Sequence, residues 1–198
     1  MASTPINPKD LLSLADYDKQ RPAAVARIIA LKTRRRVEVG PWISLVFENR
    51  DTVLYQIQEM LRIERITDAA LIDHEIETYA ELLPGQGELS LTLFVEIADA
   101  DLRSAALSKL GGIEKSLTLQ IGDDIPIPAF DKRPIDPAWE RPGQATAVYY
   151  LGFKLSSEQR RLFNSAKDEV WLKFGHPEYR HASALSSAQR RELAGAGW

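Results

Sequence analysis

One stretch of the chain alternates between apolar and polar side chains more regularly than any other. From Leu89 to Ile97 every odd-numbered residue is aliphatic, and Ser90, Thr92 and Glu96 stand among the residues between them. Successive side chains of a β-strand point to opposite faces, so this pattern is typical of a strand with one buried face. The sequence therefore predicts a central strand that buries Leu89, Leu91, Leu93, Val95 and Ile97.

Weaker patterns on both sides of this strand predict further elements. Apolar residues at helical spacing indicate helices over residues 8–20, 21–36, 51–66, 69–83, 99–111 and from about 186. Ser156-x-x-Gln159 is a capping box that opens another helix. Alternating patterns indicate a hairpin over 37–39 and 43–47, and strands over 117–121, 147–155 and 170–174. We expect an α+β fold with a mixed, mostly antiparallel sheet of five or six strands and helices packed mainly on one face.

The length of 198 residues predicts one domain, which we assign to residues 1–185. A short C-terminal helix and a frayed tail then occupy residues 186–198. Residues 122–144 contain five prolines and apolar residues, which indicates a long loop packed on the domain. Such a loop is either a lid or a packed connection.

Composition narrows the class of protein. The chain is 44% hydrophobic and 27% charged, as in ordinary globular proteins, and its net charge of −3 disfavours nucleic acid as a partner. It has no cysteine, which excludes disulfides and thiolate ligands and fits the cytoplasm. Its first residues show no signal-peptide pattern, and no apolar run approaches the length of a membrane span. We expect a cytoplasmic protein that binds neither nucleic acid nor a membrane.

Common catalytic and cofactor motifs are absent, so the reaction, if there is one, and any cofactor stay unknown. There is no phosphate-binding P-loop, dinucleotide fingerprint, zinc-protease motif or EF-hand loop. The weak metal candidates are His74, Glu77 and Glu81, which share one face of a predicted helix. A solvated polar face is the commoner explanation of that spacing.

The predicted helix over 51–66 carries the most informative polar residues. On a helical wheel Glu64 falls within the apolar arc formed by Val53, Ile57 and Leu61. A carboxylate in that position costs several kcal/mol unless it is paired, so we expect Glu64 to be buried beside an arginine. The alternative is that the helix ends before Glu64, or that Glu64 lies at a solvated rim.

Other candidates stand at the ends of elements. Arg35 belongs to an arginine run at a helix C-terminus, where cations either stabilise the helix dipole or bind an anion. His176 and Tyr179 follow the last predicted strand, where they either form a site or terminate the sheet. The resulting hypothesis is one functional site that contains Arg35, Glu59, Arg62, Glu64, His176 and Tyr179. Its alternative is that the helix charges pair among themselves on the surface.

Three motifs resemble an uncharacterised bacterial family, domain of unknown function 3501, nearly end to end. In chain order they are Arg35-Arg36-Val37-x-x-Gly40-Pro41, Tyr55-x-x-Gln58-Glu59-Met60-Leu61-Arg62-x-Glu64 and His176-Pro177-x-Tyr179. The family supplies no catalytic residues. The resemblance implies a role in redox or oxidative-stress physiology, beside a rubrerythrin-like or iron–sulfur redox protein.

Two functional hypotheses follow. The first is a non-catalytic accessory or binding protein, which meets a redox partner through the face that carries Glu59, Arg62 and the proline-rich loop. The second is an enzyme, binding a small molecule or a metal, with a site around Glu64, Arg62 and His176.

Overall fold

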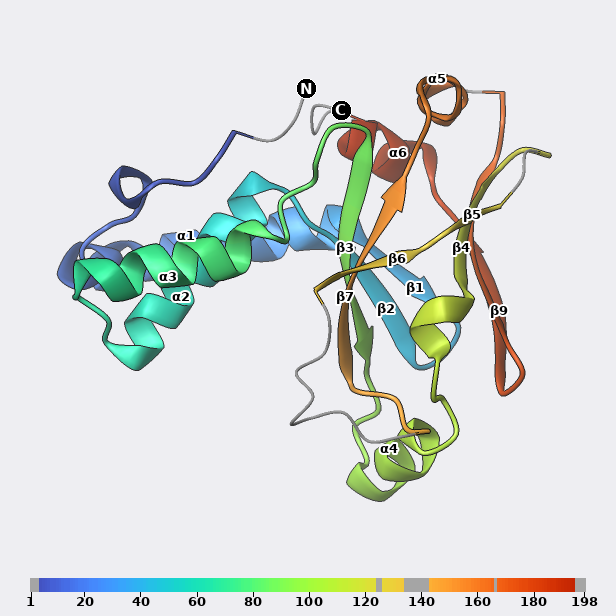
Figure 1. Ribbon diagram of the computed structural model, residues 1–198, viewed down its shortest axis with the longest axis horizontal. Helices are drawn as coiled ribbons and strands as arrows, with labels where there is room; N and C mark the ends of the chain where they lie inside the picture. The colour runs from blue at the N-terminus through green and yellow to red at the C-terminus, as the bar shows by residue number, and fades with distance from the viewer. Residues whose placement is uncertain (1–3, 124–125, 134–142, 166, 195–198) are drawn as a thin grey trace.

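Two antiparallel sheets form the larger part of the protein, and three helices extend from one of them (Figure 1). The computed structural model describes residues 4–123, 126–133, 143–165 and 167–194. The five-stranded sheet has the order β1-β2-β3-β7-β6, with bounds Arg36–Val39, Ile43–Phe47, Glu88–Val95, Val148–Lys154 and Phe130–Arg133. The four-stranded sheet has the order β5-β4-β8-β9, with bounds Ile127–Pro128, Leu117–Ile121, Val170–His176 and Tyr179–Ala184.

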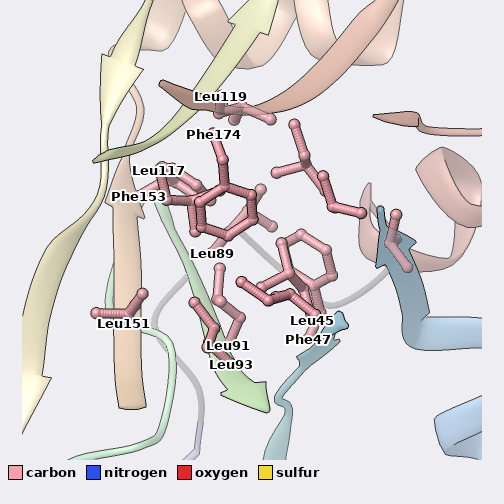
Figure 2. Close-up of a cluster of buried hydrophobic side chains, with 14 of the residues drawn as sticks. Leu45, Phe47, Leu89, Leu91, Leu93, Leu117, Leu119, Leu151, Phe153 and Phe174 are labelled. Atoms are coloured by element: carbon pink, nitrogen blue, oxygen red, sulfur yellow. The ribbon is translucent and has the colours of Figure 1, made fainter. Parts of the chain in front are cut away.

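The main hydrophobic core lies between these sheets (Figure 2). The inward residues of β3 are buried, as the alternation predicts, and β3 is the middle strand of its sheet. Ile97 lies beyond the end of β3 and is only half-buried. Leu45 and Phe47 of β2 and Phe153 of β7 flank β3, and β4 and β8 contribute Leu117, Leu119 and Phe174 from the other sheet.

The chain crosses from one sheet to the other within the predicted proline-rich loop. Strand β5 pairs with β4, and two residues later β6 pairs with β7 of the other sheet. Phe130 at the start of β6 lies directly over Gly152, where a Cβ atom would be 2.7 Å from the phenyl ring. Part of the predicted loop is therefore strand, while its residues 124–125 and 134–142 lie outside the described residues.

Helices α1 (Leu14–Arg35), α2 (Arg50–Glu64) and α3 (Ala69–Ala80) form what we call the helical arm, together with the short helix η1 (Pro8–Asp10). The arm has a core of its own, made of Ile6, Val53, Ile57, Leu61, Ile76 and Leu82. The predicted division into two helices over residues 8–20 and 21–36 is wrong, because one helix, α1, spans this boundary with Pro22 inside it. A proline there removes a hydrogen bond of the helix, so packing against α2 must compensate for the loss.

The remaining helices lie at the ends of the two sheets. They are α4 (Ala100–Leu107), η2 (Ile113–Ser116), α5 (Ser157–Asn164) and α6 (Ser187–Ala194). The α+β class and the antiparallel pairing are confirmed. The strands divide between two sheets, however, and the helices do not confirm the predicted packing mainly on one face. No helix in the described part of the chain is long and apolar enough to cross a membrane.

Strand β9 was not predicted from the sequence. The last predicted strand covers residues 170–174, whereas β8 continues to His176 and turns directly into β9 at Tyr179. Strand β9 lies at the edge of its sheet, and apart from the buried Tyr179 its residues are mostly exposed. A mostly exposed edge strand lacks the apolar alternation that would identify it.

Candidate functional site

Glu59, one of the predicted site residues, is held by two side chains of α1. Arg21 donates from Nε to Oε1 and from Nη2 to Oε2, both at 2.9 Å, and the Tyr17 hydroxyl donates to Oε1 at 2.6 Å. The Arg21 bonds lower the pKa of Glu59 most, burial opposes them, and the Tyr17 bond lowers it further. Both carboxylate oxygens are thus committed to joining α1 and α2.

The neighbouring polar residues of α2 have the same role. The Gln58 amide accepts from the main-chain nitrogen of Leu12 at 2.8 Å and donates to the Leu12 carbonyl at 3.2 Å. Arg62 donates from Nε to Asp18 at 2.7 Å, in a pair that is largely exposed. The segment from Gln58 to Arg62 therefore fastens α2 to the N-terminal half of α1 and to the residues before it.

The expectation that Glu64 is buried beside an arginine is wrong. Glu64 is exposed, and within the described ranges its side chain forms no hydrogen bond or ion pair. It is the last residue of α2, and Arg65 after it takes a left-handed conformation with φ of 54°. The apolar arc stops being buried at Leu61, so the structure shows the solvated rim that was the alternative.

Arg35 is a buried anchor at the end of α1, with 2% of its surface exposed. Its guanidinium donates to the main-chain oxygens of Phe47 (2.8 Å) and Glu48 (3.2 Å), and to the Glu192 carboxylate of α6 (3.2 Å). Burial lowers the pKa of Arg35, and the Glu192 carboxylate opposes this effect. Arg35 thus connects the helical arm to β2 and to α6.

His176 and Tyr179 are likewise bonded to the main chain. His176 Nδ1 accepts from the Glu178 nitrogen at 3.2 Å, so in the neutral ring Nε2 carries the hydrogen and donates to the Gly111 carbonyl at 3.1 Å. The Tyr179 hydroxyl donates to the Val39 carbonyl at 2.6 Å and accepts from the nitrogens of Trp42 and Ile43, both at 3.2 Å.

The six predicted residues therefore do not share one cleft. Glu59, Arg62 and Glu64 belong to α2 in the helical arm, whereas His176 and Tyr179 lie at the β8–β9 turn, toward the other end of the long axis (Figure 1). The weak metal candidates His74, Glu77 and Glu81 are all exposed. Among the residues that the structure describes, no group of three or more His, Asp or Glu side chains could hold a metal ion.

A cavity of about 280 Å³ lies beside the β1–β2 turn, and we call it the Trp42 pocket. Trp42 is 39% exposed, and its indole is stacked on the Tyr179 ring with the centroids 5.6 Å apart. Helix α4 forms the opposite wall, and its Leu102 is 65% exposed. The full lining is Trp42, Ile97, Leu102, Ala105, Ala106, Lys109, Leu110 and Glu178.

A second cavity of about 150 Å³, the joint pocket, lies between the helical arm and the outward face of the five-stranded sheet. Glu48, which is only 8% exposed, is one of its lining residues. Its full lining is Lys32, Glu48, Thr52, Val53, Gln56, Leu82, Thr92, Phe94, Val148 and Tyr150.

None of the residues that line these two pockets was predicted as a site residue. Glu48 directly follows the fully buried strand β2 and is itself nearly buried, which no pattern in the sequence indicates. The available signal for Trp42 was a large aromatic residue directly after the turn-forming pair Gly40-Pro41. The Trp42 pocket borders two of the three family motifs. Trp42 directly follows the motif that ends in Gly40-Pro41, and Glu178 lies within His176-Pro177-x-Tyr179.

Comparison with known proteins agrees with this architecture. A crystal structure described as a novel protein of unknown function from Burkholderia pseudomallei K96243 is 33% identical, with a TM-score of 0.88. The match covers 98% of this chain and 100% of that one. No curated protein matches the chain. Residues 5–196 match the family described as "Protein of unknown function (DUF3501)", so the chain belongs to the DUF3501 family.

Proposed function

We propose that the protein is a non-catalytic accessory protein of the cytoplasm, which binds a redox partner through the Trp42 pocket. The observation that carries the proposal is an apolar pocket with a partly exposed tryptophan on one wall and an exposed leucine on the other. Buried aromatic anchors supply much of the affinity of protein interfaces, and tryptophan is enriched among them.

The Trp42 side chain is held in place before any partner arrives. The Tyr179 ring supports the indole, and the Tyr179 hydroxyl fixes the main chain at Trp42 and Ile43. A preorganised side chain loses little conformational entropy on binding, which favours affinity. Lys109 and Glu178 at the lining add one charge of each sign, and such charges orient a partner more than they add affinity.

The hydrogen bonds that the acid–base candidates already form within the protein also support binding over catalysis. Glu59 has both oxygens paired, and His176 has both nitrogens bonded to the main chain. A general base needs a free atom within hydrogen-bond reach of its substrate. The enzyme hypothesis around Glu64, Arg62 and His176 has no such atom at His176.

The partner class comes from the family resemblance, which implies a rubrerythrin-like or iron–sulfur redox protein. The test is isothermal titration calorimetry of the purified protein against one purified representative of each class from the same genome. We expect a Kd on the order of micromolar for one of them. Trp42→Ala and Leu102→Ser should each weaken binding by about tenfold or more.

The matched control is Ile63→Ser, which changes another exposed aliphatic residue, on α2. It should leave the affinity unchanged. Equal affinity of the wild type and of both pocket variants would place the interface elsewhere and refute the proposal. So would the absence of binding to both redox proteins.

A further inference from the structure

The joint pocket has no part in the function proposed above, and its chemistry is different. It is built from segments far apart in the chain: α1, Glu48 after β2, the first turns of α2, Leu82 after α3, and strands β3 and β7. Four apolar side chains line it, Val53, Leu82, Phe94 and Val148. Polar groups of both charges stand among them, which is the usual composition of a small-molecule site.

Glu48 offers one unused carboxylate oxygen to this cavity. Its Oε1 accepts from the Thr92 hydroxyl at 2.6 Å. Within the described residues Oε2 has no hydrogen-bond partner, and it is not among the atoms sealed from solvent. The nearby Arg35 guanidinium bonds the main-chain oxygen of Glu48 instead of its carboxylate. A nearly buried carboxylate with a free oxygen favours a ligand that donates hydrogen bonds or carries positive charge.

Lys32 supplies the opposite charge. It is half-buried on α1, and across the described ranges its ammonium group forms neither a hydrogen bond nor an ion pair. Lys32 and Glu48 therefore line one cavity without pairing with each other. Arg35 attracts the Glu48 carboxylate from a distance but does not bond it, so a ligand with a single charge would leave either Glu48 or Lys32 without a hydrogen-bond partner in the cavity, which is unfavourable.

Tyr150 adds a hydrogen-bond donor. Its ring packs against the core of the helical arm, and its hydroxyl has no hydrogen-bond partner in the described part of the chain. Burial raises the pKa of Tyr150, and the neighbouring Tyr79 raises it further, so the phenol keeps its proton at neutral pH. It can therefore donate to a carboxylate or hydroxyl oxygen of a ligand.

We propose that the joint pocket binds a small zwitterionic molecule of the amino-carboxylic acid class. Its ammonium group bonds Glu48, its carboxylate bonds Lys32 and Tyr150, and its carbon chain contacts the apolar walls. A cavity of this volume accepts a molecule of about the size of benzene, which limits the ligand to a few carbons. Because the walls belong to both the arm and the sheet, the ligand stabilises their packing.

The test uses the full-length protein and a series of commercial probes. Glycine, β-alanine and γ-aminobutyrate carry both charges at increasing separation, whereas propylamine and propionate each carry one. Binding is measured by isothermal titration calorimetry and by the rise of the melting temperature at saturating ligand. We expect one zwitterion to bind with a Kd on the order of 0.1–1 mM, at least tenfold tighter than either singly charged probe.

Three variants locate the site. Lys32→Met, Glu48→Gln and Tyr150→Phe should each weaken zwitterion binding by about threefold or more, and the first two most. Glu48→Gln keeps an acceptor for Thr92, and Tyr150→Phe keeps the packing of the ring, so the set remains informative if one variant folds poorly. The controls Lys19→Met and Glu64→Gln change exposed charges of α1 and α2, away from the pocket lining, and should bind as the wild type does.

Three results would overturn the proposal. They are no binding of any zwitterion at about 10 mM, equal binding of a singly charged probe, or unchanged affinity in all three variants. Leu102→Ser in the Trp42 pocket should leave zwitterion binding intact. This measurement distinguishes the ligand proposal from the proposal of a redox partner at the Trp42 pocket, so either proposal can fail while the other holds.

Discussion

Arg21 binds the Glu59 carboxylate through two parallel hydrogen bonds of 2.9 Å, although the two residues are 38 positions apart in the sequence. The bonds join the N-terminal half of α1 to the middle of α2. Arg21 stands next to Pro22, which has no N–H group and so leaves α1 without one of its own hydrogen bonds. A bidentate pair fixes orientation as well as distance. The pair thus sets the geometry of the helical arm.

The first prediction concerns this pair. Glu59→Gln removes the charge-assisted bonds to Arg21 and should lower the free energy of unfolding by roughly 1–3 kcal/mol. Urea denaturation measures the effect. Glu64→Gln, five residues further along α2, should change the free energy by no more than about 0.5 kcal/mol, because Glu64 is exposed and unpaired in the described structure. Equal losses in both variants would contradict the assignment of Glu59 as the paired carboxylate.

The pH dependence of stability provides a second prediction. The pKa of Glu59 in the folded protein lies below its ordinary value of 4.5, so the unfolded chain binds this proton more tightly. The contribution of Glu59 is therefore complete above the ordinary pKa and is lost as the pH falls through the lowered one. Between about pH 5 and pH 3 the wild type should lose more stability than Glu59→Gln. Parallel curves for the two proteins would show that this carboxylate has no lowered pKa.

A third prediction concerns Tyr179. Tyr179→Phe leaves the Val39 carbonyl and the nitrogens of Trp42 and Ile43 without their common partner, and should cost roughly 1–3 kcal/mol. The control is Tyr55→Phe, because the Tyr55 hydroxyl has no hydrogen-bond partner within the described residues. Chemical denaturation of both variants gives the comparison. A harmless Tyr179→Phe would mean that water replaces the hydroxyl at the turn.

The fourth prediction concerns Gly40, which has a φ of 77° and lies against Tyr179. A Cβ atom there would be 2.5 Å from the Tyr179 hydroxyl and 2.6 Å from the His181 ring. Gly40→Ala should therefore cost more than about 2 kcal/mol, through both backbone strain and overlap. Gly112→Ala has a similar φ of 83° but no neighbour within 4 Å, so it measures the strain alone. Similar melting temperatures for these two variants would show that the overlap is relieved without cost.

Local patterns located most elements, because each pattern depends on residues within one element. The alternation along β3 and the capping box before α5 are both present in the structure. The burial of Ser90 and Thr92, on the other face of β3, was not predicted. Both faces of this strand are covered, and the cover over the second face comes from elements that the alternation itself does not specify.

The prediction of the site residues was wrong for the same reason, because their partners lie on other elements of the chain. On the helical wheel Glu64 lies in the apolar arc and Glu59 outside it, yet Glu59 is the paired residue and Glu64 is exposed. The side of α2 that carries Glu59 meets α1, whose Tyr17 and Arg21 are some 40 positions away in sequence. No property of a single helix identifies which second helix covers it. The alternative, that the helix charges pair among themselves, is also wrong for Glu59 and Arg62, because their partners Arg21 and Asp18 are on α1.

The Tyr179 contact also has a consequence for synthesis of the chain. The β1–β2 turn leaves the ribosome early. Three of its main-chain groups, however, form hydrogen bonds with the Tyr179 hydroxyl, which follows Val39 by 140 residues. The end of α1 obtains one of its partners later still, because Arg34 pairs with Glu192, 158 residues further along the chain. Nascent chains emerge from their N-terminus, at about 5–20 residues per second. The β1–β2 turn therefore lacks its Tyr179 partner for roughly 7–28 s of synthesis, so one of the first elements to be made is among the last to be completed.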